Sequence, residues 1–301
     1  MSVAPWELLA GVGLDLLVGD PRWFPHPVRG FGWLAKRLER LWRGTRIPLR
    51  LAGGLFWITA CGSATLIVSV TLPWAAIFWI WALLALRDLD VEATRVLREL
   101  DAGNLTGAQQ KLSLIVGRDT AELDEAGIIR AVVETVAENL NDAVIAPLFF
   151  LALGGVPAMA AYKAANTLDS MVGYRSEKYR EFGWASARLD DVANFLPARL
   201  SALLIWCCAL LLGYDARRSV CVTLRDASSQ PSPNAGYPEA AVAGALGIRL
   251  GGLNYYQGVP SRKCYLGDPV SPLTRGKFTQ VRKLLYGTAA LMTLAVCGAR
   301  S

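Results

Sequence analysis

The segment from residue 51 to residue 86 limits the possible folds more than any other part of this sequence. It reads LAGGLFWITACGSATLIVSVTLPWAAIFWIWALLAL and contains no charged residue. At about 1.5 Å of rise per residue, a helix of this length is longer than one crossing of a bilayer core of about 30 Å. Pro73, near its middle, favours a hairpin of two crossings. Because 53% of all residues are hydrophobic and only 19% are charged, the composition also indicates a membrane protein.

Further apolar segments extend this prediction and lie at residues 143–161, 200–212 and 284–298. We therefore expect an all-α, polytopic helical membrane protein with about four or five transmembrane helices. The whole chain, 1–301, is predicted to form a single integral membrane domain. The segment 143–161 contains two prolines and the pair Gly154 and Gly155, which favours a re-entrant segment over a plain crossing.

The polar segments are predicted to lie on the cytoplasmic face. Basic residues greatly outnumber acidic ones between residues 20 and 50, and such loops stay inside the cell. Residues 87–142 have apolar positions at helical spacing, which predicts amphipathic helices on this face. Residues 162–199 and 213–283 are predicted to be polar loop segments that carry the functional site. The net charge of +6 is attributed to loops that face anionic lipid, so nucleic acid is not an expected partner.

Charged residues recur every four positions just before the second apolar segment. Arg130, Glu134, Glu138 and Asp142 share one face of a predicted helix. Such spacing usually means a solvated, salt-bridged stripe. Near a bilayer, however, an unpaired acid costs a few kcal/mol, so we expect these acids to have a partner or a function.

Two clusters between residues 162 and 199 repeat this polar pattern. The first cluster consists of Lys163, Asn166 and Asp169 at helical spacing, and the second consists of Arg188, Asp190, Asp191 and Asn194 in RLDDVAN. Carboxylate and amide oxygens are ligands that Mg²⁺ prefers, and arginine binds phosphate bidentately. A single cluster would be interpreted as an ion-pair network that seals a loop. The repetition favours a phosphate-handling site.

Two turns add candidate residues. GDPRWFPHPVR is a loop fixed by prolines and contains His26, the only histidine of the chain. A lone histidine in a turn is more often structural than catalytic. SPNAGYPEAA, with Asn234 and Glu239, reads as a turn followed by a helix start, where backbone amides bind anions. Neither a Walker A sequence nor GxGxxG is present, and the six cysteines form no CxxC pair, which disfavours a metal or disulfide role for them.

Four ordered blocks together resemble the cobinamide synthase (adenosylcobinamide-phosphate synthase) membrane proteins of cobalamin biosynthesis. The blocks are GDPRWFPHPVRGFG, GRDTAELDEAGIIRAVVETVAENLNDAVIAPLFF, YKAANTLDSMVGYRSEKYREFGWASARLDDVANFLPARL and SPNAGYPEAAVAGALGIRLGG. The resemblance extends from about residue 15 to residue 268. The resemblance therefore covers nearly the whole chain.

The resemblance implies a multi-pass enzyme of the cell inner membrane with its site facing the cytoplasm. It implies an ATP-dependent acid–amine (amide) ligase that attaches (R)-1-amino-2-propanol or its O-phosphate to adenosylcobyric acid, giving adenosylcobinamide or its phosphate. Mg²⁺ and ATP are the expected cofactor and co-substrate. The corrinoid, the amine and the lipid bilayer are the expected partners, and a complex with other late enzymes of the pathway is compatible with this role.

The roles of individual residues are hypotheses, because the resemblance brings no settled catalytic assignment. We expect the metal ligands to be Asp169, Asp190 and Asp191. We expect catalytic roles for His26, Glu134, Glu138, Asp169, Asp190 and Glu239, with His26 or Glu239 as the base for the amine. We expect phosphate and substrate contacts from Arg118, Lys163, Asn166, Arg175, Arg188, Asn194 and Asn234. Family members commonly have histidine where this chain has Gln230, which leaves His26 as the only imidazole.

Two other classes of function stay open. An intramembrane prenyltransferase also uses acid-rich helices to bind Mg-diphosphate, and NTLDS with RLDDVAN resembles such a pair. The PHPVR loop and the SPNAGYPEAA turn have no evident place in that scheme. A non-catalytic membrane scaffold for corrinoid enzymes needs only helices and partner surfaces, and the cost of keeping acids near the bilayer argues against it.

Overall fold

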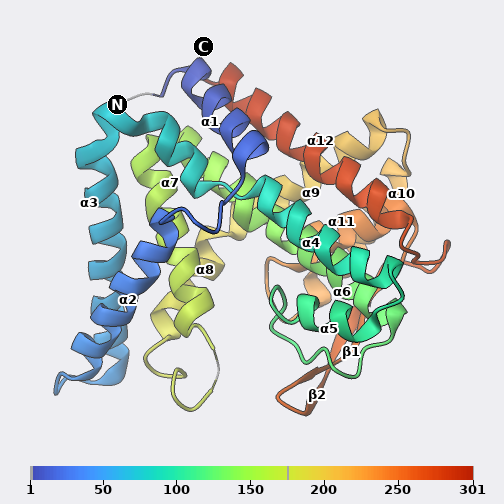
Figure 1. The fold of residues 1–301 in the computed structure, drawn as a ribbon, viewed down its shortest axis with the longest axis horizontal. Helices are drawn as coiled ribbons and strands as arrows, with labels where there is room; N and C mark the ends of the chain where they lie inside the picture. The colour runs from blue at the N-terminus through green and yellow to red at the C-terminus, as the bar shows by residue number, and fades with distance from the viewer. Residues whose placement is uncertain (1–2, 175, 301) are drawn as a thin grey trace. The chain divides into compact units, whose positions relative to one another are not determined.

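The computed structural model describes residues 3–174 and 176–300. The chain is 71% helical, and in the described ranges its only strands form one two-stranded hairpin (Figure 1). The predicted all-α class is therefore confirmed. Two helices are long and apolar enough to cross a membrane, Leu49–Leu72 and Glu125–Val172, or up to three if Trp184–Ala193 and Phe195–Leu211 form one broken span. Within the described residues, this is fewer than the four or five that we predicted.

The chain packs into two compact units, and the single integral membrane domain over 1–301 stays a prediction. Unit 1 comprises Met1–Arg87, Asp142–Phe195 and Thr293–Ser301. Unit 2 comprises Asp88–Asn141 and Leu196–Met292. Both units are assembled from segments that are far apart in the sequence, and each is described here by itself.

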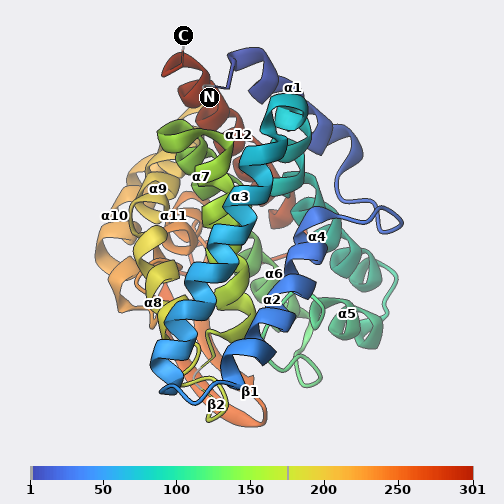
Figure 2. The ribbon, with the colours of Figure 1, turned by 90° about the vertical axis from the view of Figure 1, so that its left-hand side faces the viewer.

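Unit 1 is built around α3. Its elements are α1 (Pro5–Val18), α2 (Pro27–Arg43), α3 (Leu49–Leu83), most of the π-helical turn η1 (Asn141–Ile145), α7 (Ala146–Val172) and α8 (Trp184–Ala193). Helix α3 packs against α1, α2, α7 and α8, and α2 lies alongside it in both views (Figure 2). The buried core centres on Phe56 of α3, Leu168 of α7 and Phe182. A Cβ atom on Gly53 would lie 1.9 Å from the carbonyl oxygen of Phe182, so glycine permits this close packing.

The apolar segment 51–86 does not form the hairpin of two membrane crossings that we predicted. Residues Leu49–Leu83 are two helical pieces that meet at a kink, with non-helical backbone at Ala75, where φ is −141° and ψ is 26°. The part after the break is too short for a second crossing. The apolar character of this segment was predicted correctly, but apolarity alone does not say where a helix reverses.

The segment 143–161 is helical and follows α6 (Glu125–Leu140) through the π-helical turn, and its re-entrant course in a membrane stays a prediction. Its backbone breaks at Gly154 and at Gly155, which has a φ of +70° that favours glycine. The Arg300 guanidinium donates hydrogen bonds to the carbonyl oxygens of Leu151 and Ala152 just before the break. These bonds satisfy carbonyl groups that the interrupted helix leaves without a partner.

Unit 2 contains the remaining helices and the hairpin. Its elements are α4 (Leu86–Asp101), which begins at the unit boundary, α5 (Leu105–Leu112), α6, α9 (Phe195–Leu211), α10 (Ala216–Asp226), η2 (Ala227–Ser229), α11 (Gly236–Leu246), β1 (Leu250–Tyr256), β2 (Val259–Leu266) and most of α12 (Lys277–Gly298). Gln257 and Gly258 both have positive φ, as a type I′ hairpin turn requires. The predicted loops 162–199 and 213–283 are thus largely helix and hairpin. Their polar residues lie on amphipathic elements, and polar composition alone does not distinguish such an element from a loop.

Candidate functional site

Two carboxylates and two amides converge in unit 1, and we call Asp142, Asn166, Asp190 and Asn194 the acid–amide cluster. The Asn166 side-chain amide donates to Asp142 Oδ2 at 3.1 Å and to Asp190 Oδ1 at 3.4 Å. The Asn194 amide donates to Asp190 Oδ2 at 3.0 Å. The Tyr162 hydroxyl donates to Asn194 Oδ1 at 2.9 Å. One amide nitrogen of Asn166 therefore bridges the two carboxylates.

Helix periodicity explains why these side chains meet. Tyr162 and Asn166 are four residues apart on α7, and Asp190 and Asn194 are four residues apart at the end of α8, so each pair lies on one face of its helix. Asp142 lies in the π-helical turn, a local distortion that is frequent at functional sites. The packing of α7 against α8 then brings these faces together.

Further charged residues surround the acid–amide cluster. Lys163 Nζ donates to the backbone carbonyl oxygen of Asp142 at 3.4 Å. Asp169 lies close enough to Asp142 and Asp191 for repulsion between their charges. Neighbouring carboxylates of this kind favour a shared proton or a bound cation.

The donor set fits a magnesium ion that is also held by substrate oxygens. In the described ranges, no group of three or more His, Cys, Asp or Glu side chains is arranged to hold a metal by itself. Mg²⁺ is usually bound by one or two carboxylates together with water and substrate phosphates, which the pair Asp142 and Asp190 offers. Of the predicted ligands, Asp190 belongs to the cluster, whereas Asp169 and Asp191 flank it.

His26 is buried at the start of α2 in unit 1. Its Nε2 atom lies 3.2 Å from Asp20 Oδ1, and its ring meets the Trp81 ring edge-on at a centroid distance of 5.6 Å. The Trp81 indole nitrogen donates to the carbonyl oxygen of Gly19 at 3.0 Å, which holds this loop against α3. The charge of Asp20 also acts on Lys163, so the imidazole lies in the same electrostatic neighbourhood as the acid–amide cluster.

A buried ion pair in unit 2 joins two predicted site residues. Arg118 Nη2 lies 2.5 Å from Glu134 Oε2, and Arg118 Nη1 donates to Asn254 Oδ1 at 2.6 Å. The backbone amide of Gly251 donates to Glu134 Oε1 at 2.7 Å. These contacts connect α6 to the hairpin, and the two charges neutralise each other. The arrangement favours a structural role for both residues over phosphate binding or catalysis.

Glu239 lies fully buried in the first turn of α11, also in unit 2. Neither of its carboxyl oxygens has a hydrogen-bond partner in the described part of the chain. Burial and the nearby charge of Glu138 raise the pKa of Glu239 well above its usual range, although Lys263 opposes the shift. Burial acts to lower the pKa of Lys263, but the charges of Glu239 and Glu138 contribute to a net increase. The carboxyl group of Glu239 therefore keeps its proton to a higher pH than an exposed glutamate does.

The SPNAG turn of unit 2 is held by the guanidinium group of an arginine. Arg199 donates to Asn234 Oδ1 at 3.3 Å and to the Tyr237 hydroxyl at 3.1 Å. The amide of Gln230 donates to the carbonyl oxygen of Cys264 at 2.9 Å and so anchors the turn to β2. A hydrogen-bonding residue at position 230 thus has a structural use here that needs no proton transfer.

The structure brings together only some of the predicted site residues. Unit 1 holds His26, Lys163, Asn166, Asp169, Arg188, Asp190, Asp191 and Asn194, and unit 2 holds Arg118, Glu134, Glu138, Asn234 and Glu239. Arg188 is exposed, and Arg175 lies outside the described residues. Sequence reasoning missed Asp142 and Tyr162 as site residues. Asp142 had a signal, because it ends the four-residue repeat of charges, but its contacts lie on other helices.

Known proteins are similar to this chain over nearly its full length. A family model described as CobD/Cbib protein matches residues 8–285. The chain is 47% identical over 305 residues to "Cobalamin biosynthesis protein CobD" of Geobacter metallireducens, covering 98% of this chain and 96% of that protein. It is 44% identical over 317 residues to "Cobalamin biosynthesis protein CbiB" of Salmonella typhimurium, covering 99% of this chain and 98% of that protein. No solved structure matches the chain.

Proposed function

The chain belongs to the CobD/CbiB family, and on that premise we propose that it is an ATP-dependent amide ligase. The names of its relatives support a role in cobalamin biosynthesis. The proposed reaction joins (R)-1-amino-2-propanol or its O-phosphate to the free carboxylate of adenosylcobyric acid, at the cytoplasmic face of the cell inner membrane. The observation that carries the proposal is the convergence of Asp142 and Asp190 on the Asn166 amide.

The proposed chemistry has two steps. A carboxylate oxygen of the corrinoid attacks the γ-phosphorus of ATP, and ADP leaves with the electrons of the broken P–O bond. The amine nitrogen then attacks the acyl phosphate carbon, inorganic phosphate leaves, and the amine proton passes to a base. Transfer of this kind depends mainly on positioning and on neutralising charge.

The residues of unit 1 offer these functions. Asp142 and Asp190 would hold Mg²⁺, which supplies positive charge beside the transferred phosphoryl group when it is bound. Asn166 and Asn194 orient the two carboxylates through the hydrogen bonds described above. Lys163 carries the cation nearest to this cluster in the described contacts and is suited to an anionic oxygen. His26, set against Asp20, is the proposed base for the amine.

The experiment that tests this function uses the purified full-length protein in nanodiscs. Adenosylcobyric acid, aminopropanol phosphate and Mg-ATP are added, and corrinoid mass and ADP are followed together. We expect a corrinoid with the mass of adenosylcobinamide phosphate and an equal amount of ADP. Corrinoid binding without product would contradict the ligase and support a scaffold. Pyrophosphate release from an isoprenoid diphosphate would support the prenyltransferase instead.

A further inference from the structure

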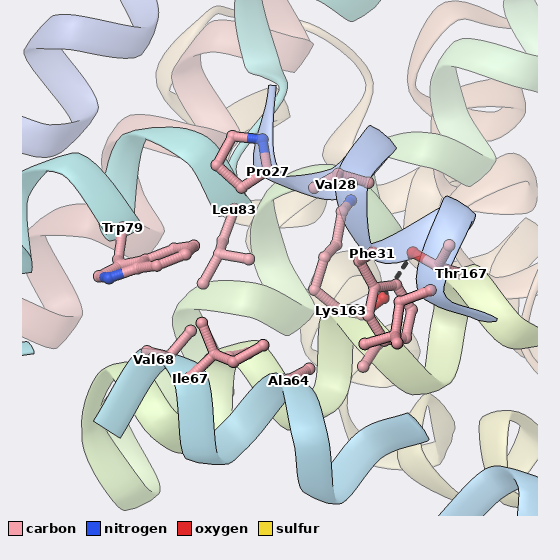
Figure 3. A pocket seen from close by; sticks show the side chains of 14 residues that line it. Pro27, Val28, Phe31, Ala64, Ile67, Val68, Trp79, Leu83, Lys163 and Thr167 are labelled. Carbon is pink, nitrogen blue, oxygen red and sulfur yellow. Dashed lines mark hydrogen bonds between the residues drawn. The ribbon is translucent and has the colours of Figure 1, made fainter. Parts of the chain in front are cut away.

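A pocket of about 250 Å³ lies between α2, α3 and α7 of unit 1 (Figure 3). Its walls are largely apolar, with Phe31 from α2, Ile67 and Val68 from α3, and Trp79 beyond the break in α3. Among the described residues, Lys163 is the only charged one that lines it. The pocket is thus a hydrophobic space that borders the acid–amide cluster through a single side chain.

The polar groups at the pocket have partners inside the protein. The Thr167 hydroxyl donates to the carbonyl oxygen of Lys163 at 2.7 Å. The Lys163 ammonium donates to the carbonyl oxygen of Asp142 and is surrounded by the charges of Asp142, Asp20 and Asp15. A cavity holds ordered water only where several polar groups need partners, so an apolar occupant suits this one better.

The helix that forms one wall is also a candidate membrane span. Only 28% of the apolar window in Leu49–Leu72 is buried within the protein, so most of this surface faces its surroundings. Ile67 lines the pocket and is still 49% exposed, and its neighbour Leu66 is 65% exposed. The pocket therefore opens onto the same side of α3 that would face the acyl chains of a bilayer.

The depth of the pocket along this span agrees with that environment. At about 1.5 Å of rise per residue, Val68 lies about 6 Å and Ala64 about 12 Å from the Leu72 end of the span. The span itself is about 36 Å long against a hydrocarbon core of about 30 Å, so both residues lie at the depth of acyl chains.

We propose that this pocket holds an acyl chain of a membrane phospholipid. An apolar space that opens into the hydrocarbon layer is filled at least cost by the apolar molecules of that layer. The acyl chain packs against Phe31 and Val68 and covers the hydrocarbon stem of Lys163. It thereby keeps water away from one side of the acid–amide cluster. This inference concerns a lipid site and does not depend on the proposed ligase activity.

The test uses two glycines of α2 as a matched pair. Gly30 lines the pocket, Gly32 does not, and an added Cβ atom would meet nothing within 4 Å at either position. Gly30→Leu therefore narrows the pocket, whereas Gly32→Leu adds the same side chain to the same helix elsewhere. Each protein is placed in phosphatidylcholine nanodiscs that contain a trace of the same lipid with a photoactivatable diazirine at the end of one acyl chain. Adducts are mapped by peptide mass spectrometry.

We expect adducts on residues 27–34, 64–68 and 160–167 of the unaltered protein. We also expect Gly30→Leu to lose them while Gly32→Leu keeps them. Adducts confined to the outer residues Leu66 and Val70 would overturn the proposal, as would equal labelling of the pocket in both variants. Displacement of the label by adenosylcobyric acid alone would also overturn it and would assign the pocket to substrate. Thermal unfolding of both variants checks that the loss does not come from a damaged fold.

Discussion

The Asn166 amide is the smallest feature on which the proposed site depends. It donates to one oxygen of Asp142 and one of Asp190, so it fixes the separation of two groups that repel each other when both are ionised. Sequence reasoning identified Asn166 and Asp190 from helical spacing. It did not identify Asp142 as a site residue, because no spacing along one helix reveals a contact made across two.

Asp142→Asn tests this pairing. We expect it to lower kcat in the ligase assay by about 10- to 100-fold, comparable to Asp190→Asn, because both remove a carboxylate from the same site. The double variant should lose little more than either single variant, since residues that act as a unit are not additive. Exposed Glu177 of unit 1 supplies the control, and Glu177→Gln should leave kcat unchanged. Additive losses would show that the two carboxylates act separately.

Glu239 gives a second prediction, on stability against pH. Its folded pKa is raised above the ordinary value of 4.5, so the unfolded chain loses this proton first as the pH rises. The contribution of Glu239 to stability is therefore full below about pH 4.5 and declines as the pH rises toward the folded pKa. Glu239→Gln, which stays neutral, should remove this decline. Thermal unfolding at pH 5 and pH 8 measures this decline in stability. If the stability of the variant depends on pH as that of the unaltered protein does, the raised pKa of Glu239 is contradicted.

At the scale of elements, close packing of α3 depends on one of two adjacent glycines. A Cβ atom on Gly53 would lie 1.9 Å from the Phe182 carbonyl oxygen, whereas one on Gly54 would meet nothing within 4 Å. We expect Gly53→Ala to destabilise the protein by about 1–3 kcal/mol through overpacking. Gly54→Ala should be neutral or stabilising by up to about 1 kcal/mol, because alanine favours helix. Chemical denaturation in detergent compares them, and equal effects would mean that α3 does not pack here.

The elements also show how far the sequence could predict the fold. Apolar length and helical spacing correctly indicated an all-α chain, with a helix over most of the segment 51–86. Pro73 correctly indicated an interruption, since the helix is kinked at Ala75, but the predicted second crossing failed because the piece after the kink is too short. Apolar length and helical spacing also failed on the polar segment 162–199, where α8 carries its charged residues on a helix. Polar composition indicates exposure to water or a partner, not loop conformation.

On the scale of the whole molecule, the polar residues divide between two units with different properties. In unit 2, Arg118 and Glu134 are buried, paired and hydrogen-bonded to the hairpin. In unit 1, Asp142 and Asp190 are held together by an amide although they have the same charge. The sequence showed both sets as acids and bases at helical spacing. Only the tertiary pairing distinguishes a neutralised ion pair from a like-charged cluster suited to a cation.

This division predicts that stability and turnover respond to different residues. Arg118→Met leaves Glu134 buried without its main partner and should destabilise the protein by about 3–5 kcal/mol. Turnover per folded molecule, counted from the soluble fraction in nanodiscs, should change little. Asp190→Asn should do the reverse and lower turnover while the unfolding temperature stays nearly constant. The double variant Arg118→Met with Glu134→Leu should recover much of the lost stability, because it removes the unpaired charge. Abolished turnover at unchanged stability in Arg118→Met would contradict the structural role and would show that Arg118 binds phosphate.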